Sequence, residues 1–153
     1  MIVCAANSGT AAGETGFAPS WRHIWRYDMI AIDFGNLCFN AAVSEQNISA
    51  VVAPKSVYSS LDDFITAALL FLDSDERFCS DWTELYKNRT NLPASEEDLA
   101  WMKSRLEEMN QRVTVLHEPV TRAVNLIPPK WNDLSLGLET DSEYILYLWG
   151  TSA

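Results

Sequence analysis

The sequence predicts an α+β fold with a mostly antiparallel sheet and about three helices packed on one face. Three observations support this prediction: strand-length apolar runs come first, amphipathic helical patterns occupy the middle, and strand patterns return at the end. A chain of 153 residues fits one domain. We therefore expect residues 21–153 to form a single domain. Residues 1–20, rich in Ala, Gly, Ser and Thr, are expected to form a flexible N-terminal lead-in.

The first strand signals lie between residues 27 and 53. Tyr27 to Phe34 alternates in part and reads as a strand, Gly35-Asn36 is a turn signal, and Leu37 to Val43 resumes an apolar pattern. Together these segments predict a β-hairpin. Ile48 to Ala53 is a third, shorter apolar run that ends at Pro54.

The helical signals are the strongest in the chain. Ser60 can cap a first helix, and the residues after it place apolar side chains on one helical face. That face contains Leu61, Phe64, Ile65, Ala68, Leu69 and Leu72. A second, shorter helix is predicted over residues 80–87. A third begins at Ser95, with an acid three places on at Asp98, and its apolar stripe is Leu99, Met102, Leu106 and Met109.

The last third of the chain returns to β character. Val113 to His117 and Val120 to Ile127 are possible strands, and residues 130–143 resemble an acidic loop. Tyr144 to Trp149 is apolar at every position, so this final strand is expected to be central or covered on both faces.

The net charge of −10 limits the classes of partner. A surface of this sign is repelled by the phosphate backbone of nucleic acids and by anionic membranes. The same charge steers a basic protein toward the chain. We therefore expect a basic protein partner, and neither nucleic acid nor membrane.

The N-terminus and the cysteines predict a cytoplasmic protein. The first residues carry no basic segment, and their apolar stretch ends by Asn7, which does not fit a secretory signal. The three cysteines, Cys4, Cys38 and Cys79, are odd in number and widely spaced, which favours free thiols in a reducing compartment over disulfides or a metal site.

One segment resembles a nucleotide-binding loop. Asp33, Gly35 and Asn36 follow a strand pattern and resemble the first phosphate loop of the actin and heat-shock-chaperone ATPase superfamily. The resemblance implies a hairpin that holds a nucleotide phosphate. The small hydroxyl residues that usually follow the glycine are missing, as is a second such loop, and a plain β-hairpin explains the same residues.

A second segment places acids at calcium-loop spacing. Counted from Asp73, acids fall at positions 1, 3, 9 and 12, but Arg77 and Phe78 stand where an EF-hand needs an oxygen ligand and a glycine. The two histidines, His23 and His117, have no metal-ligand spacing. We therefore predict no cofactor, no metal and no catalytic residue.

Acids and aromatic rings gather in one part of the sequence. Seven acids and one base, Arg77, lie between Leu61 and Tyr86. Aromatic rings supply binding energy at interfaces, and clustered acids supply association rate and partner choice. The residues predicted to bind the partner are Asp73, Asp75, Glu76, Asp81, Trp82, Glu84 and Tyr86.

These observations predict a small, acidic, non-enzymatic binding protein. The expected class is an inhibitor or immunity-type protein that neutralises a toxin or an enzyme by occluding a basic site. Two alternatives remain. One is a structural protein that forms a homo-oligomer through Tyr144 to Trp149 or through the stripe on the third helix. The other is a small enzyme whose site is assembled from scattered residues.

Overall fold

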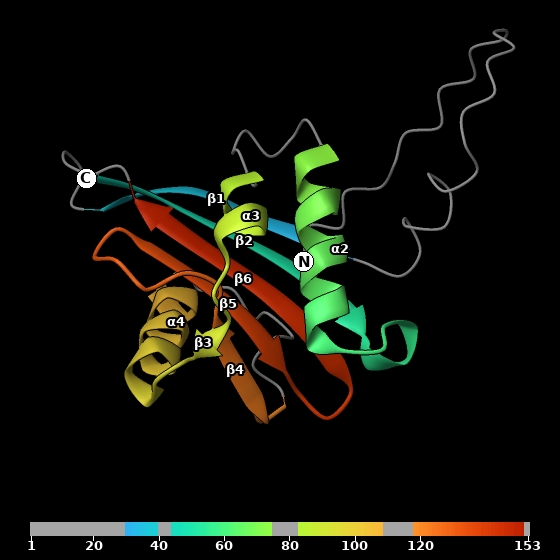
Figure 1. Cartoon of the computed structure of the whole chain (residues 1–153). Coiled ribbons are helices and arrows are strands. Elements are labelled where there is room, and N and C mark those ends of the chain that lie inside the picture. The colour runs from blue at the N-terminus through green and yellow to red at the C-terminus, as the bar shows by residue number, and fades with distance from the viewer. Residues whose placement is uncertain (1–29, 40–43, 75–82, 109–117, 152–153) are drawn as a thin grey trace, which may run out of the picture.

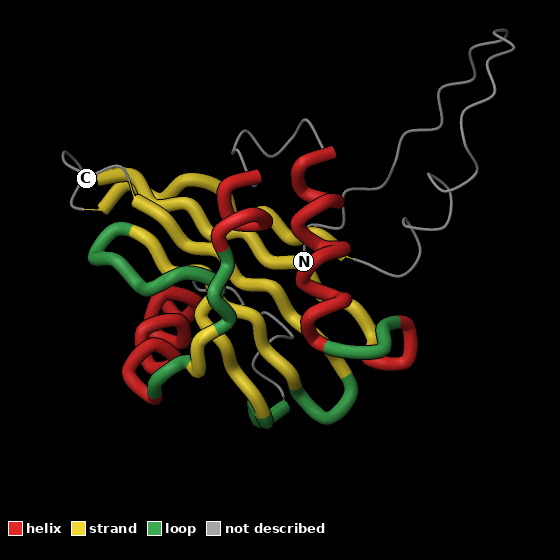
Figure 2. The backbone as a smooth tube through the Cα atoms, viewed as in Figure 1, coloured by secondary structure: helices red, strands yellow, loops and turns green. Residues whose placement is uncertain are grey.

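The computed structural model describes residues 30–39, 44–74, 83–108 and 118–151. Six strands form one sheet in the order β1-β2-β6-β5-β4-β3, and all paired strands are antiparallel (Figures 1 and 2). The strands are β1 (Ile30–Phe39), β2 (Ser44–Pro54), β3 (Leu92–Pro93), β4 (Arg122–Asn125), β5 (Asp133–Glu139) and β6 (Glu143–Thr151). The helices are the short 3-10 helix η1 (Lys55–Val57), α2 (Leu61–Ser74), α3 (Thr83–Asn88) and α4 (Glu96–Glu108). The predicted α+β class, with its mostly antiparallel sheet and three α-helices, is confirmed.

Strand β6 occupies the middle of the sheet, between β2 and β5. Every residue from Tyr144 to Trp149 is buried, as its uniformly apolar sequence predicts. Because side chains alternate along a strand, β6 contributes to two separate apolar layers. Tyr144, Leu146 and Leu148 belong to one layer, and Ile145, Tyr147 and Trp149 belong to the other.

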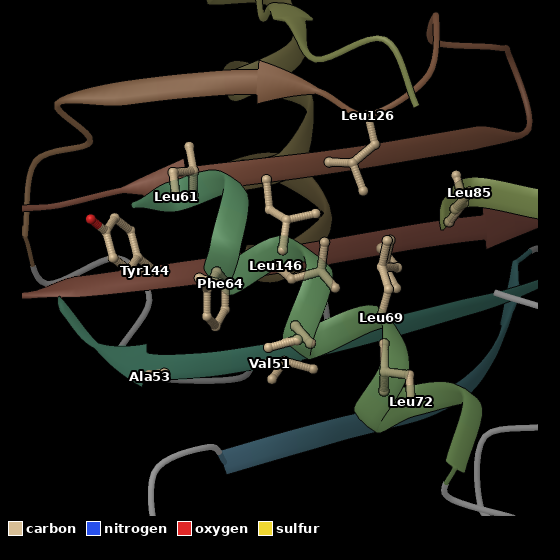
Figure 3. Close-up of a cluster of buried hydrophobic side chains, with 14 of the residues drawn as sticks. Val51, Ala53, Leu61, Phe64, Leu69, Leu72, Leu85, Leu126, Tyr144 and Leu146 are labelled. Carbon is tan, nitrogen blue, oxygen red and sulfur yellow. The ribbon is translucent and has the colours of Figure 1, made fainter. Parts of the chain in front are cut away.

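Helix α2 covers the first of these layers. Its buried residues, among them Phe64, Leu69 and Leu72, pack on Val51 of β2 and Leu146 of β6 (Figure 3). The helix begins where the sequence predicts, because the Ser60 hydroxyl accepts a hydrogen bond from the Asp63 amide at 3.1 Å. Helix α3 lies beside α2 across the same face (Figure 1).

Helix α4 covers the opposite face, so the prediction of helices on one face is wrong for this helix. Met102 and Leu106 pack on Leu136, Tyr147 and the other side chains of the second layer. The physical reason lies in β6, whose two apolar faces both require a cover. The start of α4 matches its predicted capping box, because Ser95 and Asp98 exchange hydrogen bonds of 3.1 and 2.8 Å.

Two predicted elements differ from the structure. Gly35-Asn36 does not turn the chain, because β1 continues from Ile30 to Phe39 and pairs with β2, with a register shift between Asp33 and Asn36. The irregularity is a local break in the ladder rather than a hairpin, and so the hairpin that a phosphate loop requires is not formed. The predicted acidic loop over residues 130–143 contains β5, because alternate leucines in it, such as Leu136, are buried under α4.

The remaining strand and helix predictions are confirmed where the structure describes them. Strand β4 is a shorter version of the predicted Val120 to Ile127 segment, and α3 is the described part of the predicted helix over residues 80–87. The predicted lead-in over residues 1–20 and the possible strand from Val113 to His117 lie outside the described residues.

Candidate functional site

The sheet face beneath α2 and α3 changes from apolar to polar along the same three strands. Under α2, paired positions of β2, β6 and β5 bring together Val51, Leu146 and Gly137. Because side chains alternate along a strand, every second residue points to this same face. Two residues further along each strand, toward α3, the row across β2, β6 and β5 is Ser49, Leu148 and Ser135. The row after that is Asn47, Gly150 and Asp133.

A pocket of about 350 Å³ lies over these polar rows. We call it the α3 pocket, because Glu84 and Leu85 of α3 form one wall. Its volume is at the lower end of the range of about 300–1,000 Å³ that is typical of ligand pockets. The residues that line it are Asn47, Ser49, Glu84, Leu85, Lys130, Asn132, Asp133, Ser135, Leu148, Trp149, Gly150 and Thr151.

Asp133 is the most perturbed charged group of the α3 pocket. Burial raises the pKa of the Asp133 carboxyl, and the nearby negative charge of Glu84 raises it further. A hydrogen bond from Ser135 and the positive charge of Lys130 act in the opposite direction without cancelling the increase. A carboxylate whose ionised form is disfavoured in this way is stabilised by a cation that binds beside it.

Two serine side chains form the floor of the pocket beside Asp133. Ser135 is 2% exposed, and its hydroxyl donates to Asp133 Oδ1 at 3.2 Å. Ser49 is 5% exposed and also lines the pocket. A hydroxyl can donate and accept, so Ser49 offers a hydrogen-bonding group to a ligand that enters the pocket.

Exposed aromatic rings lie on both segments that border the pocket. Trp131 is 68% exposed, at the tip of a tight turn in which the amides and carbonyls of Lys130 and Asp133 bond to each other at 2.9 and 3.1 Å. Tyr86 of α3 is 43% exposed. Rings of this size are usually at least half-buried, and exposed ones are enriched at binding surfaces.

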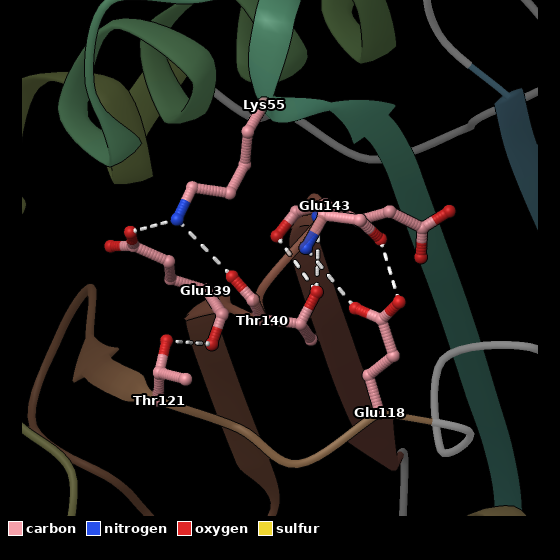
Figure 4. Close-up of polar contacts among 7 residues, drawn as sticks. Lys55, Glu118, Thr121, Glu139, Thr140 and Glu143 are labelled. Atoms are coloured by element: carbon pink, nitrogen blue, oxygen red, sulfur yellow. Dashed lines mark hydrogen bonds and ion pairs between the residues drawn. The ribbon is translucent and has the colours of Figure 1, made fainter.

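A second polar cluster lies at the far end of β5 and β6, where its groups bind one another (Figure 4). Lys55 Nζ contacts Glu139 Oε1 at 2.6 Å, and this hydrogen bond raises the pKa of Lys55. Glu118 accepts hydrogen bonds from the amide and the hydroxyl of Ser142 at 3.1 and 2.8 Å. These interactions hold the turn between β5 and β6 in place, and we assign the cluster a structural role.

The structure describes three of the seven predicted partner-binding residues. Asp73 lies exposed near the end of α2, and Glu84 and Tyr86 lie exposed on α3, where Glu84 lines the pocket. Asp75, Glu76, Asp81 and Trp82 lie outside the described residues. Of the predicted residues that the structure describes, Glu84 is therefore the one that lines the α3 pocket.

The sequence analysis did not identify the other half of this site. The sequence pattern points to neither Trp131 nor Asp133 as a binding residue, and it places Asp133 in the expected acidic loop. A signal was present in β5, where Asp133, Ser135 and Gly137 alternate with three buried leucines. Polar and small residues at every second position of a buried strand indicate one face that is either solvated or reserved for a ligand.

Both surfaces expected to pair copies of the chain are used inside the domain. Tyr144 to Trp149 is buried on both faces of the sheet, and Met102 and Leu106 of α4 are fully buried against the sheet. The described residues of both surfaces thus pack against this chain's own core, and homo-oligomer formation stays a prediction. Met109 lies outside the described residues.

The described residues contain neither a membrane-spanning helix nor a cluster of metal ligands. No helix there combines the length and apolar character needed to cross a membrane. Within residues 30–39, 44–74, 83–108 and 118–151, no three His, Cys, Asp or Glu side chains are grouped as metal ligands. The chain matches no protein family, no curated protein and no solved structure.

Proposed function

We propose that the chain is a non-enzymatic binding protein that neutralises a basic protein, a toxin or an enzyme, by occluding its basic site. The observation that carries this proposal is a pocket lined by the acids Glu84 and Asp133, with the exposed rings of Tyr86 and Trp131 on the two chain segments that border it. Aromatic anchors beside a polar recess are typical of the energetic centre of an interface.

Charge supports a basic partner. The chain carries 21 acids against 11 Lys and Arg, and the α3 pocket has two carboxylates against the single ammonium group of Lys130. Long-range attraction from such a surface raises the association rate, and aromatic rings that become buried in the complex slow dissociation. Each contribution can be removed separately by mutation.

The first experiment isolates the native complex from the host and measures its kinetics by surface plasmon resonance. We expect a one-to-one complex with a partner of positive net charge and an association rate that falls with added salt. Trp131→Ala should raise the dissociation rate by about tenfold or more, whereas Glu84→Lys should mainly slow association.

Leu92→Ala provides the matched control. Leu92 is 50% exposed but lies on β3, at the opposite edge of the sheet from β1 and away from the α3 pocket. Its removal should leave both rates unchanged. A neutral or acidic partner, or equal effects of the Trp131 and Leu92 substitutions, would contradict the proposal.

A small enzyme is the second candidate, because Asp133 with its raised pKa lines a pocket and accepts a hydrogen bond from Ser135. The near-complete burial of Ser135 makes this hydroxyl a poor nucleophile for a bulky substrate. Turnover of any substrate that is abolished by Asp133→Asn would favour the enzyme over the binding protein.

A further inference from the structure

The floor of the α3 pocket is open at its centre because of a glycine. Gly150 lies between Asn47 and Asp133 in the row that crosses the three strands. Among the described residues, a Cβ atom at this position would meet only the Asn132 carbonyl oxygen within 4 Å, at 3.8 Å, so there is room for a side chain or a ligand group directly above it. A flat group can therefore reach the strand backbone between the two polar side chains.

The groups around this opening are mostly hydrogen-bond acceptors. Asp133 presents a carboxylate from β5, and Glu84 presents another from α3 across the pocket. Ser49, 5% exposed, lines the same space from β2 and offers a hydroxyl that can accept a hydrogen bond. The pocket therefore combines excess negative charge from β5 and α3 with a hydroxyl on β2, on the other side of Gly150 in β6.

Among common ligand groups, a guanidinium fits this arrangement best. It is planar, carries five N–H donors and keeps its charge at all physiological pH values. An ammonium group is compact and strongly hydrated, so it serves fewer acceptors on separate strands. An anion is disfavoured by Asp133 and Glu84, although Lys130 at the pocket would attract it.

We propose that the α3 pocket binds the guanidinium group of an arginine side chain of the basic partner. Asp133 and Ser49 accept its hydrogen bonds, and Glu84 supplies further negative charge. Trp131 is exposed and stands between the pocket-lining residues Lys130 and Asn132 in the chain, so its ring is the nearby group that can pack on the side-chain stem. This inference rests on the proposed function, because it names the partner group that the surface recognises.

The test titrates the full chain with N-acetyl-arginine amide and follows backbone amide signals by NMR. We expect the signals of Ser49, Ser135 and Gly150 to shift, and those of Leu92 to stay unchanged. N-acetyl-citrulline amide has nearly the same shape without the charge and should produce no shift. N-acetyl-lysine amide should bind about tenfold more weakly than the arginine probe.

Matched variants assign the contacts. Asp133→Asn keeps the shape of the side chain and should weaken arginine binding by about tenfold or more. Ser49→Ala should weaken it several-fold, and Lys130→Gln should strengthen it slightly by removing a like charge. The unchanged dispersion of each variant's amide signals verifies that the domain is folded. Equal binding by wild type and Asp133→Asn, or equal binding of arginine and citrulline, would overturn the inference.

The outcome also separates this inference from the proposed function. If the arginine probe does not bind but Trp131→Ala still weakens the protein complex, the pocket assignment falls and the binding protein stands. If the probe binds at the pocket but does not compete with the basic partner, the pocket recognises a small guanidinium compound, and the assignment to a partner arginine is overturned. Competition with the partner supports both.

Discussion

The two ends of the sheet face under α2 and α3 are built from the same three strands but have different chemistry. Under α2 the row Val51, Leu146 and Gly137 is closed by a helix that packs directly on it. Two rows away, Asn47 and Asp133 border a pocket instead. The strands themselves are regular at both ends, so only the side chains decide which end becomes core and which end stays open to a ligand.

The first prediction breaks the closed end of this face. Phe64→Ala should lower the free energy of unfolding by about 3–5 kcal/mol, because Phe64 is fully buried and its ring stacks on Tyr144 at 5.7 Å between centroids. Urea unfolding followed by circular dichroism measures the change. Ser135→Ala, at the pocket end, should cost no more than about 1 kcal/mol. Equal losses would show that the pocket end is as tightly packed as the core.

The sequence predicts the closed end better than the open end for a physical reason. The apolar face of α2 and its Ser60 cap are local features, separated by only a few residues, and both are confirmed. The pocket instead brings together Asn47, Asp133 and Gly150, which lie far apart in the chain. Their proximity depends on strand order and register, and neither could be predicted from local patterns.

The errors in the fold prediction have the same origin. Gly35-Asn36 is a sound local turn signal, but pairing of the whole of β1 with β2 overrides it. Helix α4 was expected beside α2, although its stripe fits either face equally well. Which face it covers depends on the second apolar layer of β6 and on the leucines of β5. That layer becomes apparent only when the two strands are known to be neighbours.

The second prediction compares the glycines of the two rows, Gly137 on β5 under α2 and Gly150 on β6 in the floor of the α3 pocket. Gly137→Ala would place a Cβ atom 2.5 Å from Ile65 Cδ1 and 3.1 Å from Val124 Cγ2 in the packed layer under α2. Overpacking there should cost about 1–3 kcal/mol. The Cβ atom that Gly150→Ala adds would meet, among the described residues, one carbonyl oxygen at 3.8 Å. The free energy of unfolding of this variant should therefore stay within about 0.5 kcal/mol of wild type. Thermal unfolding of both variants tests the difference, and a larger loss for Gly150→Ala would contradict it.

The smallest predicted effect concerns the pH dependence of two acids on opposite faces of the sheet. Burial acts to raise the pKa of Asp98, but hydrogen bonds from Asn125 and Ser95 outweigh it and lower the pKa below its ordinary 3.8. Asp98 therefore stabilises the fold above pH 3.8, and this contribution is lost as the pH falls through the lower folded value. Asp98→Asn should reduce stability at pH 7 by at most about 1 kcal/mol, and the difference from wild type should disappear in strong acid.

Asp133 should show the opposite dependence, because its pKa in the folded chain lies above 3.8. The folded state then holds its proton more tightly than the unfolded state, so the cost of ionising Asp133 is absent below pH 3.8 and develops as the pH rises through the folded value. Asp133→Asn should thus raise stability at pH 7, by less than about 1 kcal/mol, with no gain in strong acid. Paired urea titrations at both pH values measure it. A loss of stability at pH 7 in Asp133→Asn would mean that Asp133 is a structural residue like Asp98. A gain of stability together with weaker arginine binding would instead indicate that the carboxylate lowers the stability of the fold but is needed to bind a cation.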